Sequence, residues 1–179
     1  HRVVYSDVVS FKMPILKQVS RNFNDKASTE MKISFEKFCI DQSYWLDDYS
    51  KYWALNEEND HKPWIQWKTI SVKNQNLIDE AKVMQFLFHD QWHRLQEYCR
   101  GKGIQIIGDM PIYVGYDSAD VYANPELFQL DSKGRMQYQG GCPPCEFQEE
   151  GQLWKSPLYN WQNHEKTNFE LSINLEYLG

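Results

Sequence analysis

One long amphipathic stretch constrains the fold of this chain more than any other feature. Its apolar positions recur three or four residues apart, which is the spacing of one helical face. They are Leu77, Ala81, Met84, Phe88, Trp92, Leu95 and Cys99. Asn76 can cap the start of such a helix and Gly101 can end it. The spacing therefore predicts a helix over residues 76–101 with this stripe buried.

A short apolar segment follows this helix, and a carboxylate comes at its end. Residues 104–107 have the composition of a buried strand, which we expect to lie against the stripe, and Asp109 follows Gly108. A polar residue at the C-terminal end of a buried strand usually faces the active site in barrels and doubly wound α/β folds. We therefore expect a functional role for Asp109.

Two more carboxylates, Asp117 and Asp120, lie shortly after Asp109. Glycosyl chemistry needs two carboxylates that face one bond. The same two side chains are equally able to cap a short helix through residues 118–122. The residues alone leave both interpretations open.

Weaker periodicities predict three more helices. The first is expected near residues 11–23, with Pro14 in its first turn, where proline is tolerated. Apolar side chains within residues 35–39 and 46–55 mark the second and third helices. Residues 24–30 are polar, and we expect a loop there.

Extended structure is scarce in this sequence. Residues 131–134 predict a turn between extended pieces at residues 128–130 and 136–139, and the tail from Trp161 is weakly helical. One clear strand cannot form a sheet, and a parallel sheet must be covered on both faces. Either the neighbouring strands lie in residues that this chain lacks, or the fold is nearly all helical. The first option agrees better with a chain that starts at His1 and looks cut there.

Composition narrows the class of partner. Aromatic residues make up 15% of the chain, and such rings stack on sugars as well as fill cores. The net charge of -6, without a basic block, argues against nucleic acid. No apolar run approaches the roughly 18 residues of a membrane span. No charged and then apolar leader follows His1, so we expect no signal peptide and a cytoplasmic location.

Two pairs of residues invite a metal interpretation. Cys142 and Cys145 form a lone C-x-x-C, and a zinc site would need two more ligands. His89 and His93 resemble the H-E-x-x-H motif with Asp90 in place of Glu. We expect reduced loop thiols and half-exposed helix histidines, with no metal site and no cofactor.

Several motifs resemble the amylomaltases, or 4-alpha-glucanotransferases, of glycoside hydrolase family 77. Residues 103–114 (GIQIIGDMPIYV) and 117–128 (DSADVYANPELF) carry most of this resemblance. Residues 151–154 (GQLW) and the upstream segments 38–49 and 62–64 match as well. The similarity runs from about Tyr5 to Phe169, and the order of the motifs makes it specific.

The resemblance implies an α/β fold, namely part of a (β/α)₈ TIM barrel with a helix-rich inserted subdomain. Helices dominate this fragment. We expect residues 28–75 to form the helical insertion, residues 76–128 a helix with the third barrel strand and its loop, and residues 129–160 the loop that covers the cleft. All three would belong to one catalytic barrel spanning residues 1–179.

The resemblance also implies an activity. Family members transfer α-1,4-glucan segments between maltooligosaccharides or starch chains by a retaining double displacement that excludes water. Asp109 would line the donor subsite at the end of the third barrel strand, and Gln152 and Trp154 would contact sugar. The full set of expected substrate-binding residues is Asp109, Tyr113, Asn124, Gln152 and Trp154. The implied partners are α-1,4-glucans and maltooligosaccharides.

The chain also departs from the family pattern. Cys145 stands where family members usually have an Asp. The Arg-x-Asp-His stretch with the nucleophile and the Glu-Asp-Leu-Gly motif with the acid–base Glu do not occur. We therefore expect an internal fragment that is inactive alone and self-associates through exposed barrel edges. The alternatives are a non-catalytic glucan-binding or structural remnant and, less favoured, an unrelated helical interaction domain.

Overall fold

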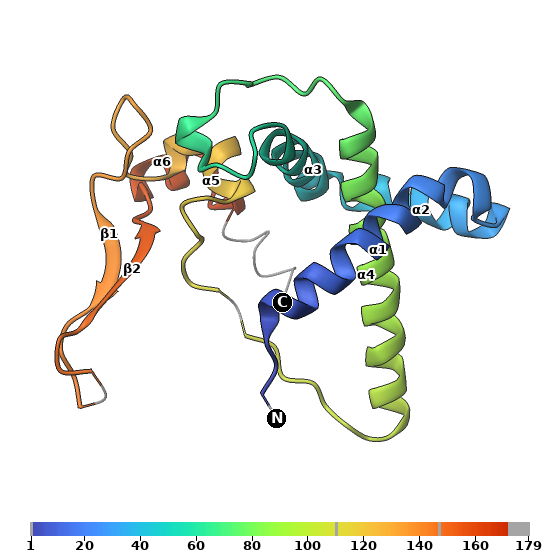
Figure 1. Cartoon of the computed structure of the whole chain (residues 1–179). Coiled ribbons are helices and arrows are strands. Elements are labelled where there is room, and N and C mark those ends of the chain that lie inside the picture. Colours follow the sequence, from blue (N-terminus) through green and yellow to red (C-terminus); the bar gives the residue numbers. More distant parts are fainter. Residues whose placement is uncertain (1, 110, 147, 172–179) are drawn as a thin grey trace. The chain divides into compact units, whose positions relative to one another are not determined.

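The computed structural model describes residues 2–109, 111–146 and 148–171, and it divides into two compact units (Figure 1). Unit 1 comprises His1–Glu57 and Ser71–Ile106, and unit 2 comprises Glu58–Ile70 and Ile107–Gly179. Residues 172–179, which we assigned to the barrel fragment, lie outside the described residues.

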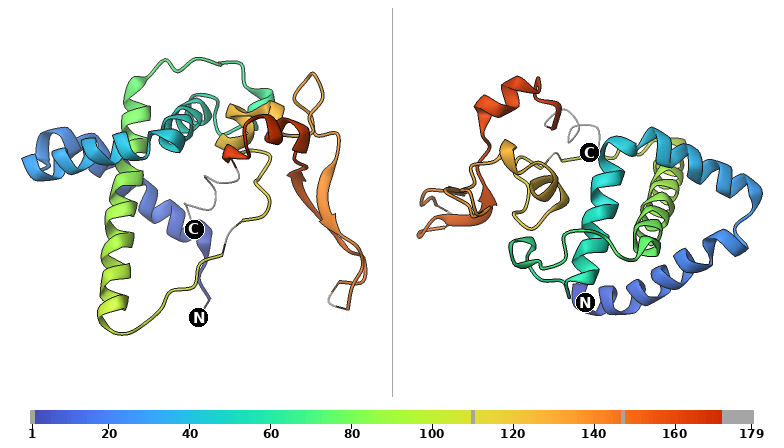
Figure 2. Two further views of the ribbon diagram at one scale, coloured as in Figure 1. Left: turned by 180° about the vertical axis from the view of Figure 1, so that it is seen from behind. Right: turned by 90° about the horizontal axis from the view of Figure 1, so that it is seen from above.

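Unit 1 is made of helices. They are α1 (Tyr5–Lys26), α2 (Thr29–Asp41), α3 (Ser43–Glu58, of which Glu58 falls in unit 2) and α4 (Gln75–Gly101) (Figures 1 and 2). The four predicted helices are confirmed, but α1 is longer than expected. The predicted loop over residues 24–30 therefore shrinks to Ala27 and Ser28, and Ser28 caps α2 by accepting from the Met31 N–H at 3.2 Å. Pro14 lies inside α1 and not in its first turn.

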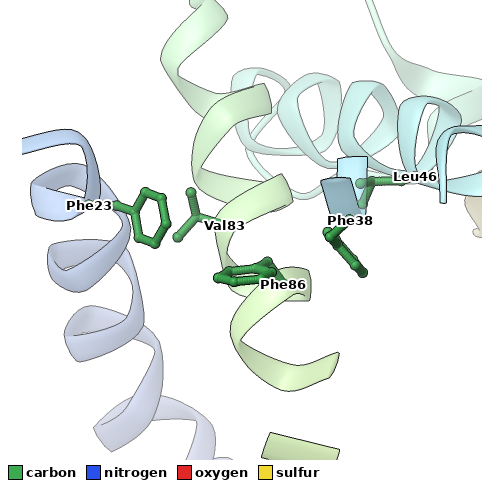
Figure 3. Close-up of a cluster of buried hydrophobic side chains, with 5 residues drawn as sticks. All are labelled: Phe23, Phe38, Leu46, Val83 and Phe86. Carbon is green, nitrogen blue, oxygen red and sulfur yellow. The ribbon is translucent and has the colours of Figure 1, made fainter. Parts of the chain in front are cut away.

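The core of unit 1 is a cluster of aromatic and aliphatic side chains from all four helices. It contains Phe23, Phe38, Leu46, Val83 and Phe86 (Figure 3). The Phe86 ring lies at its centre, with ring centroids 6.0 Å from Phe23 and 5.7 Å from Phe38. Burial of each such side chain is worth about 1.5–3 kcal/mol, so this cluster holds α1, α2 and α3 on α4.

The predicted buried face of α4 is only partly right, although the helix itself is confirmed: of the predicted stripe, Ala81 is buried. The buried residues are Glu80, Ala81, Val83 and Phe86, whereas Phe88 is 64% exposed and Leu95 is 47% exposed. Periodicity identifies an apolar stripe, but the neighbours decide which face is covered. Here α1 and α2 pack against α4 on the side of Phe86. The cap also differs, because Asn74 and not Asn76 accepts the first free N–H.

The predicted strand at residues 104–107 does not form in the described structure. Ile104, Ile106 and Ile107 are 55%, 42% and 93% exposed, so they do not lie against α4. A strand needs a neighbour to pair its N–H and C=O groups. Within the described residues the one sheet contains β1 and β2 only, so this segment has no neighbouring strand and no barrel is present.

Unit 2 contains short elements around a second core. They are η1 (Trp64–Gln66), α5 (Ala119–Ala123), η2 (Pro125–Leu127), β1 (Gln139–Cys142), β2 (Gln152–Pro157) and α6 (Trp161–Lys166). The core residues are Val114, Val121, Leu127, Phe128 and Tyr159. β1 and β2 are antiparallel, with Gly141 opposite Leu153 and an irregularity between Gln139 and Gly141.

The predicted turn at residues 131–134 is confirmed. Leu130 and Met136 bridge across it, and the Asp131 carboxylate accepts from the Lys133 and Arg135 N–H groups and from Arg135 Nε. The helical tail is confirmed as α6. No helix among the described residues is both long and apolar enough to cross a membrane.

Candidate functional site

Three of the five predicted substrate-binding residues lie together in unit 2. Trp154 Nε1 donates to Gln152 Oε1 at 2.8 Å, and the Trp154 ring lies 5.5 Å from the Tyr113 ring at an interplanar angle of 54°. Trp154 is 43% exposed. β2 carries Gln152 and Trp154, while Tyr113 comes from the loop before α5. The three side chains therefore form a partly exposed aromatic and amide surface.

Gly140 on β1 provides the room for this pair. A Cβ atom at this position would lie 3.3 Å from the Trp154 ring and 3.5 Å from the Tyr113 ring. A side chain there would press on the Trp154 ring and would be in ordinary van der Waals contact with the Tyr113 ring. The sequence analysis did not identify Gly140 as a site residue. The two adjacent glycines, Gly140 and Gly141, just before Cys142 are the signal that could have identified it.

The buried Tyr159 ring packs against Tyr113. The two rings stack with centroids 6.0 Å apart and an interplanar angle of 13°. The Tyr159 hydroxyl donates to the Ile112 carbonyl at 3.1 Å. Burial raises the pKa of the Tyr159 phenol, and Asp120 and Tyr113 add to this rise. Tyr159 therefore stays a neutral donor, and it was missed as a site residue because only the folded chain stacks it on Tyr113.

Asn124 and Asp109 lie elsewhere. The Asn124 side chain donates to the Asp120 carbonyl at 3.3 Å, so in the described contacts it closes the end of α5 and does not join Trp154. Asp109 is exposed in irregular backbone, so the strand-end position expected for it is not formed. Its role in binding sugar stays a prediction.

The two carboxylates near α5 have different structural roles. Ser118 caps α5 by accepting from the Val121 N–H at 3.3 Å, while Asp117 accepts from the Trp64 N–H at 3.2 Å. Asp120 lies in the first turn of α5, where a negative charge is favourable. The short helix predicted through residues 118–122 is thus present, but the capping side chain is Ser118.

The altered position, Cys145, is exposed at the far end of the β1–β2 hairpin. Its N–H donates to the Gln148 carbonyl at 3.0 Å, and the Gln148 N–H donates back at 3.1 Å. Cys142 and Cys145 are both free thiols. Among the described residues, no group of three or more His, Cys, Asp or Glu side chains is arranged to hold a metal ion.

Comparison with known proteins shows similarity to one protein family along almost the whole chain. The family model described as 4-alpha-glucanotransferase matches residues 1–175. The chain is 38% identical to the 4-alpha-glucanotransferase of Clostridium butyricum, over 93% of this chain and 36% of the relative. It is 39% identical to the chloroplastic/amyloplastic enzyme of Solanum tuberosum, over 94% of this chain and 31% of the relative.

A solved structure has a similar fold. It is the amylomaltase from Streptococcus agalactiae in complex with acarbose, which matches with a TM-score of 0.83 and 31% sequence identity. The match covers 97% of this chain and 37% of that one. The chain thus spans about a third of the length of the relatives that it matches.

Proposed function

The chain belongs to the 4-alpha-glucanotransferase family, and from this premise we propose that it is part of an enzyme that moves α-1,4-glucan segments between maltooligosaccharides or starch chains. We also infer that the whole protein is a (β/α)₈ barrel with a helix-rich insertion, of which residues 104–107 supply the third strand. The segment boundaries given for the insertion, the strand and the cleft loop belong to this proposal.

The observation that carries the proposal is the grouping of Tyr113, Gln152 and Trp154. The apolar face of a glucose ring stacks on an aromatic ring, and Trp154 offers such a ring to solvent. The Trp154 N–H is occupied by Gln152 Oε1, which holds the indole in place. This leaves the Gln152 amide nitrogen to donate to sugar hydroxyls.

The proposed reaction is a double displacement. A carboxylate attacks the anomeric carbon, and the glycosidic oxygen leaves with a proton from an acid. A sugar hydroxyl of the acceptor then displaces the carboxylate and gives its proton to the conjugate base of that acid. Residues of this chain bind and orient the glucan, with Asp109 and Asn124 as further sugar contacts. The hairpin that carries Trp154 covers the cleft, and it excludes the water that would compete with the acceptor.

Binding of maltoheptaose to the purified chain tests this proposal. Replacing Trp154 or Tyr113 with Ala should weaken the affinity measured by titration calorimetry about 2- to 12-fold, since one aromatic contact is worth about 0.5–1.5 kcal/mol. Tyr98→Ala is the matched control, because Tyr98 is an exposed tyrosine on α4 in the other unit. Unchanged affinity of the Trp154 variant would contradict the proposal.

A non-catalytic glucan-binding remnant is the second candidate. Within residues 1–179 the two motifs that carry the nucleophile and the acid–base Glu do not occur, so these residues offer sugar contacts and not the reacting carboxylates. Incubation of the chain with maltotriose tests the remnant. Production of glucose and longer oligosaccharides, above a heat-killed control, would exclude the remnant, whereas binding without transfer is expected of both candidates.

A further inference from the structure

Two histidines on α4 aim the same ring nitrogen at each other. His89 Nε2 and His93 Nε2 are 3.0 Å apart, and their ring centroids are 4.3 Å apart. The residues are one helical turn apart, and both rings are accessible from solvent. Neutral imidazole is a good ligand for borderline divalent cations.

The pair is held in place by packing. The His89 ring lies against the buried Phe38 ring with centroids 4.9 Å apart. α4 fixes the spacing of the two backbone positions. Because these contacts already restrict the His89 ring, little further order is lost when it takes a ligand.

The separation of the two nitrogens is that of a hydrogen bond, in which the N–H of one imidazole faces the lone pair of the other. Two ligands at about 2.1 Å from a metal and 90° apart are also about 3.0 Å from each other. A cation that replaces the shared proton can therefore be held by both nitrogens with little movement of either ring. Square-planar or tetragonal nitrogen sites suit Cu²⁺ and Ni²⁺, and Cu²⁺ binds most tightly in the first-row order.

We propose that His89 and His93 form a two-nitrogen chelate for Cu²⁺ or Ni²⁺ on the surface of α4, with water in the remaining positions. Neighbouring charges fit this assignment. Asp90 is engaged by Arg94 at 2.9 Å, so its carboxylate is not offered as a third ligand. The site is thus an open surface chelate, which goes beyond the expectation that these are ordinary helix histidines, and it does not depend on the glucan function.

Calorimetric titration with Cu²⁺ in a non-coordinating buffer tests the site. All variants carry His1→Ala, Cys142→Ser and Cys145→Ser, so that neither this imidazole nor the two free loop thiols, which bind and reduce Cu²⁺, contribute. One Cu²⁺ per chain is expected, and both His89→Ala and His93→Ala should lower the affinity about 100-fold, because the second bond of a chelate is intramolecular. Bound Cu²⁺ should also raise the melting temperature of the chain that keeps both His89 and His93, because Cu²⁺ binds the folded helix selectively.

The sharpest control keeps both histidines but breaks their spacing. The double exchange Gln91→His with His93→Gln preserves composition and the Asp90–Arg94 pair, and it moves the second imidazole off the face of His89. Its circular dichroism spectrum should match that of the parent chain, and its Cu²⁺ affinity should fall to that of His93→Ala. Equal Cu²⁺ affinity of the parent and exchanged chains would overturn the proposal, and His61→Ala should leave binding unchanged.

Discussion

Among single residues, Gly140 decides whether the Tyr113 and Trp154 rings can lie together. Its backbone does not require a glycine conformation, because the glycines with positive φ are Gly103, Gly134 and Gly151. The requirement is space for the two rings, 3.3 Å and 3.5 Å from a Cβ atom. A methyl group at this position therefore affects the packing of the rings and not the backbone conformation.

Gly140→Ala should leave the chain folded and weaken maltoheptaose binding, because Trp154 must move by a few tenths of an ångström or more. We expect a severalfold loss of affinity by calorimetry with a helical circular dichroism signal equal to that of the parent chain. Gly101→Ala is the matched control, because a Cβ there meets nothing within 4 Å. Equal losses in the two variants would show that Gly140 has no special role.

Asp131 gives the hairpin after Leu130 a pH dependence. Its side-chain hydrogen bond with Arg135, helped by backbone N–H groups of Arg135 and Lys133, lowers the pKa of the carboxyl from 3.8 to about 2. A carboxyl with a lowered pKa in the folded state adds stability above its unfolded pKa, and this stability is lost as pH falls toward 2.

Acid titration of the hairpin checks this sign. Between pH 5 and pH 2, as roughly set by these pKa values, NMR shifts of the Lys133 and Arg135 amides should report loss of the hydrogen bonds, and Asp131→Asn should remove most of the change. Asp25→Asn, at an exposed position on α1, is the control. Amide shifts that titrate around pH 4 in the parent chain would mean that the Arg135 contact is not formed.

At the scale of elements, α4 shows what periodicity predicts and what it leaves open. The apolar spacing was sufficient to predict α4 and the three preceding helices, because helical faces are set by local sequence. It assigned Phe88 to the core, although Phe86 occupies that place. The covered face depends on which helices pack against it, and this information is not local.

Alanine substitutions separate the two faces of α4. Phe86→Ala should lower the free energy of unfolding by about 3–5 kcal/mol, because it empties the centre of the unit 1 core. Phe88→Ala should change it by less than about 0.5 kcal/mol, because its ring is already largely in water. Urea unfolding followed by circular dichroism measures both. A large loss of unfolding free energy in the Phe88 variant, without one in the Phe86 variant, would show that the predicted stripe is the buried face.

The site was predictable to the extent that its residues belong to family motifs. Tyr113, Gln152 and Trp154 lie in such motifs, and the structure groups them. Gly140 and Tyr159 were missed because their roles arise from pairing of β1 with β2 and from packing beneath Tyr113. The prediction of a strand at residues 104–107 was wrong for the described chain. A strand needs hydrogen-bonding neighbours from other parts of the sequence, and the described sheet contains β1 and β2 only.

At the scale of the whole molecule, apolar side chains remain in water. Phe11 is 71% exposed, Ile107 is 93% exposed and Ile112 is 75% exposed, in addition to Phe88 and Leu95. Exposed apolar surface of this kind favours association between chains. The unpaired segment at residues 104–107 adds backbone groups that another strand can pair with.

Sedimentation velocity over a range of concentrations measures this tendency. We expect the average mass of the 179-residue chain to rise with concentration, and a double substitution of Ile107 and Ile112 to Ser to reduce the rise. The matched control replaces Ser71 and Ser132, two polar positions, with Ala. A strictly monomeric chain that melts cooperatively above about 60 °C would instead show a self-sufficient domain.

The contact between Tyr113 and Trp154 also has an optical consequence. Two rings held 5.5 Å apart at a fixed angle couple their electronic transitions, and fixed tertiary packing of this kind gives circular dichroism in the near ultraviolet. A sugar that covers the exposed face of Trp154 replaces water there and changes its fluorescence. Because the chain has seven tryptophans, the difference between the spectra of the parent chain and a Trp154→Phe variant isolates this signal at the place where a glucan is expected to bind.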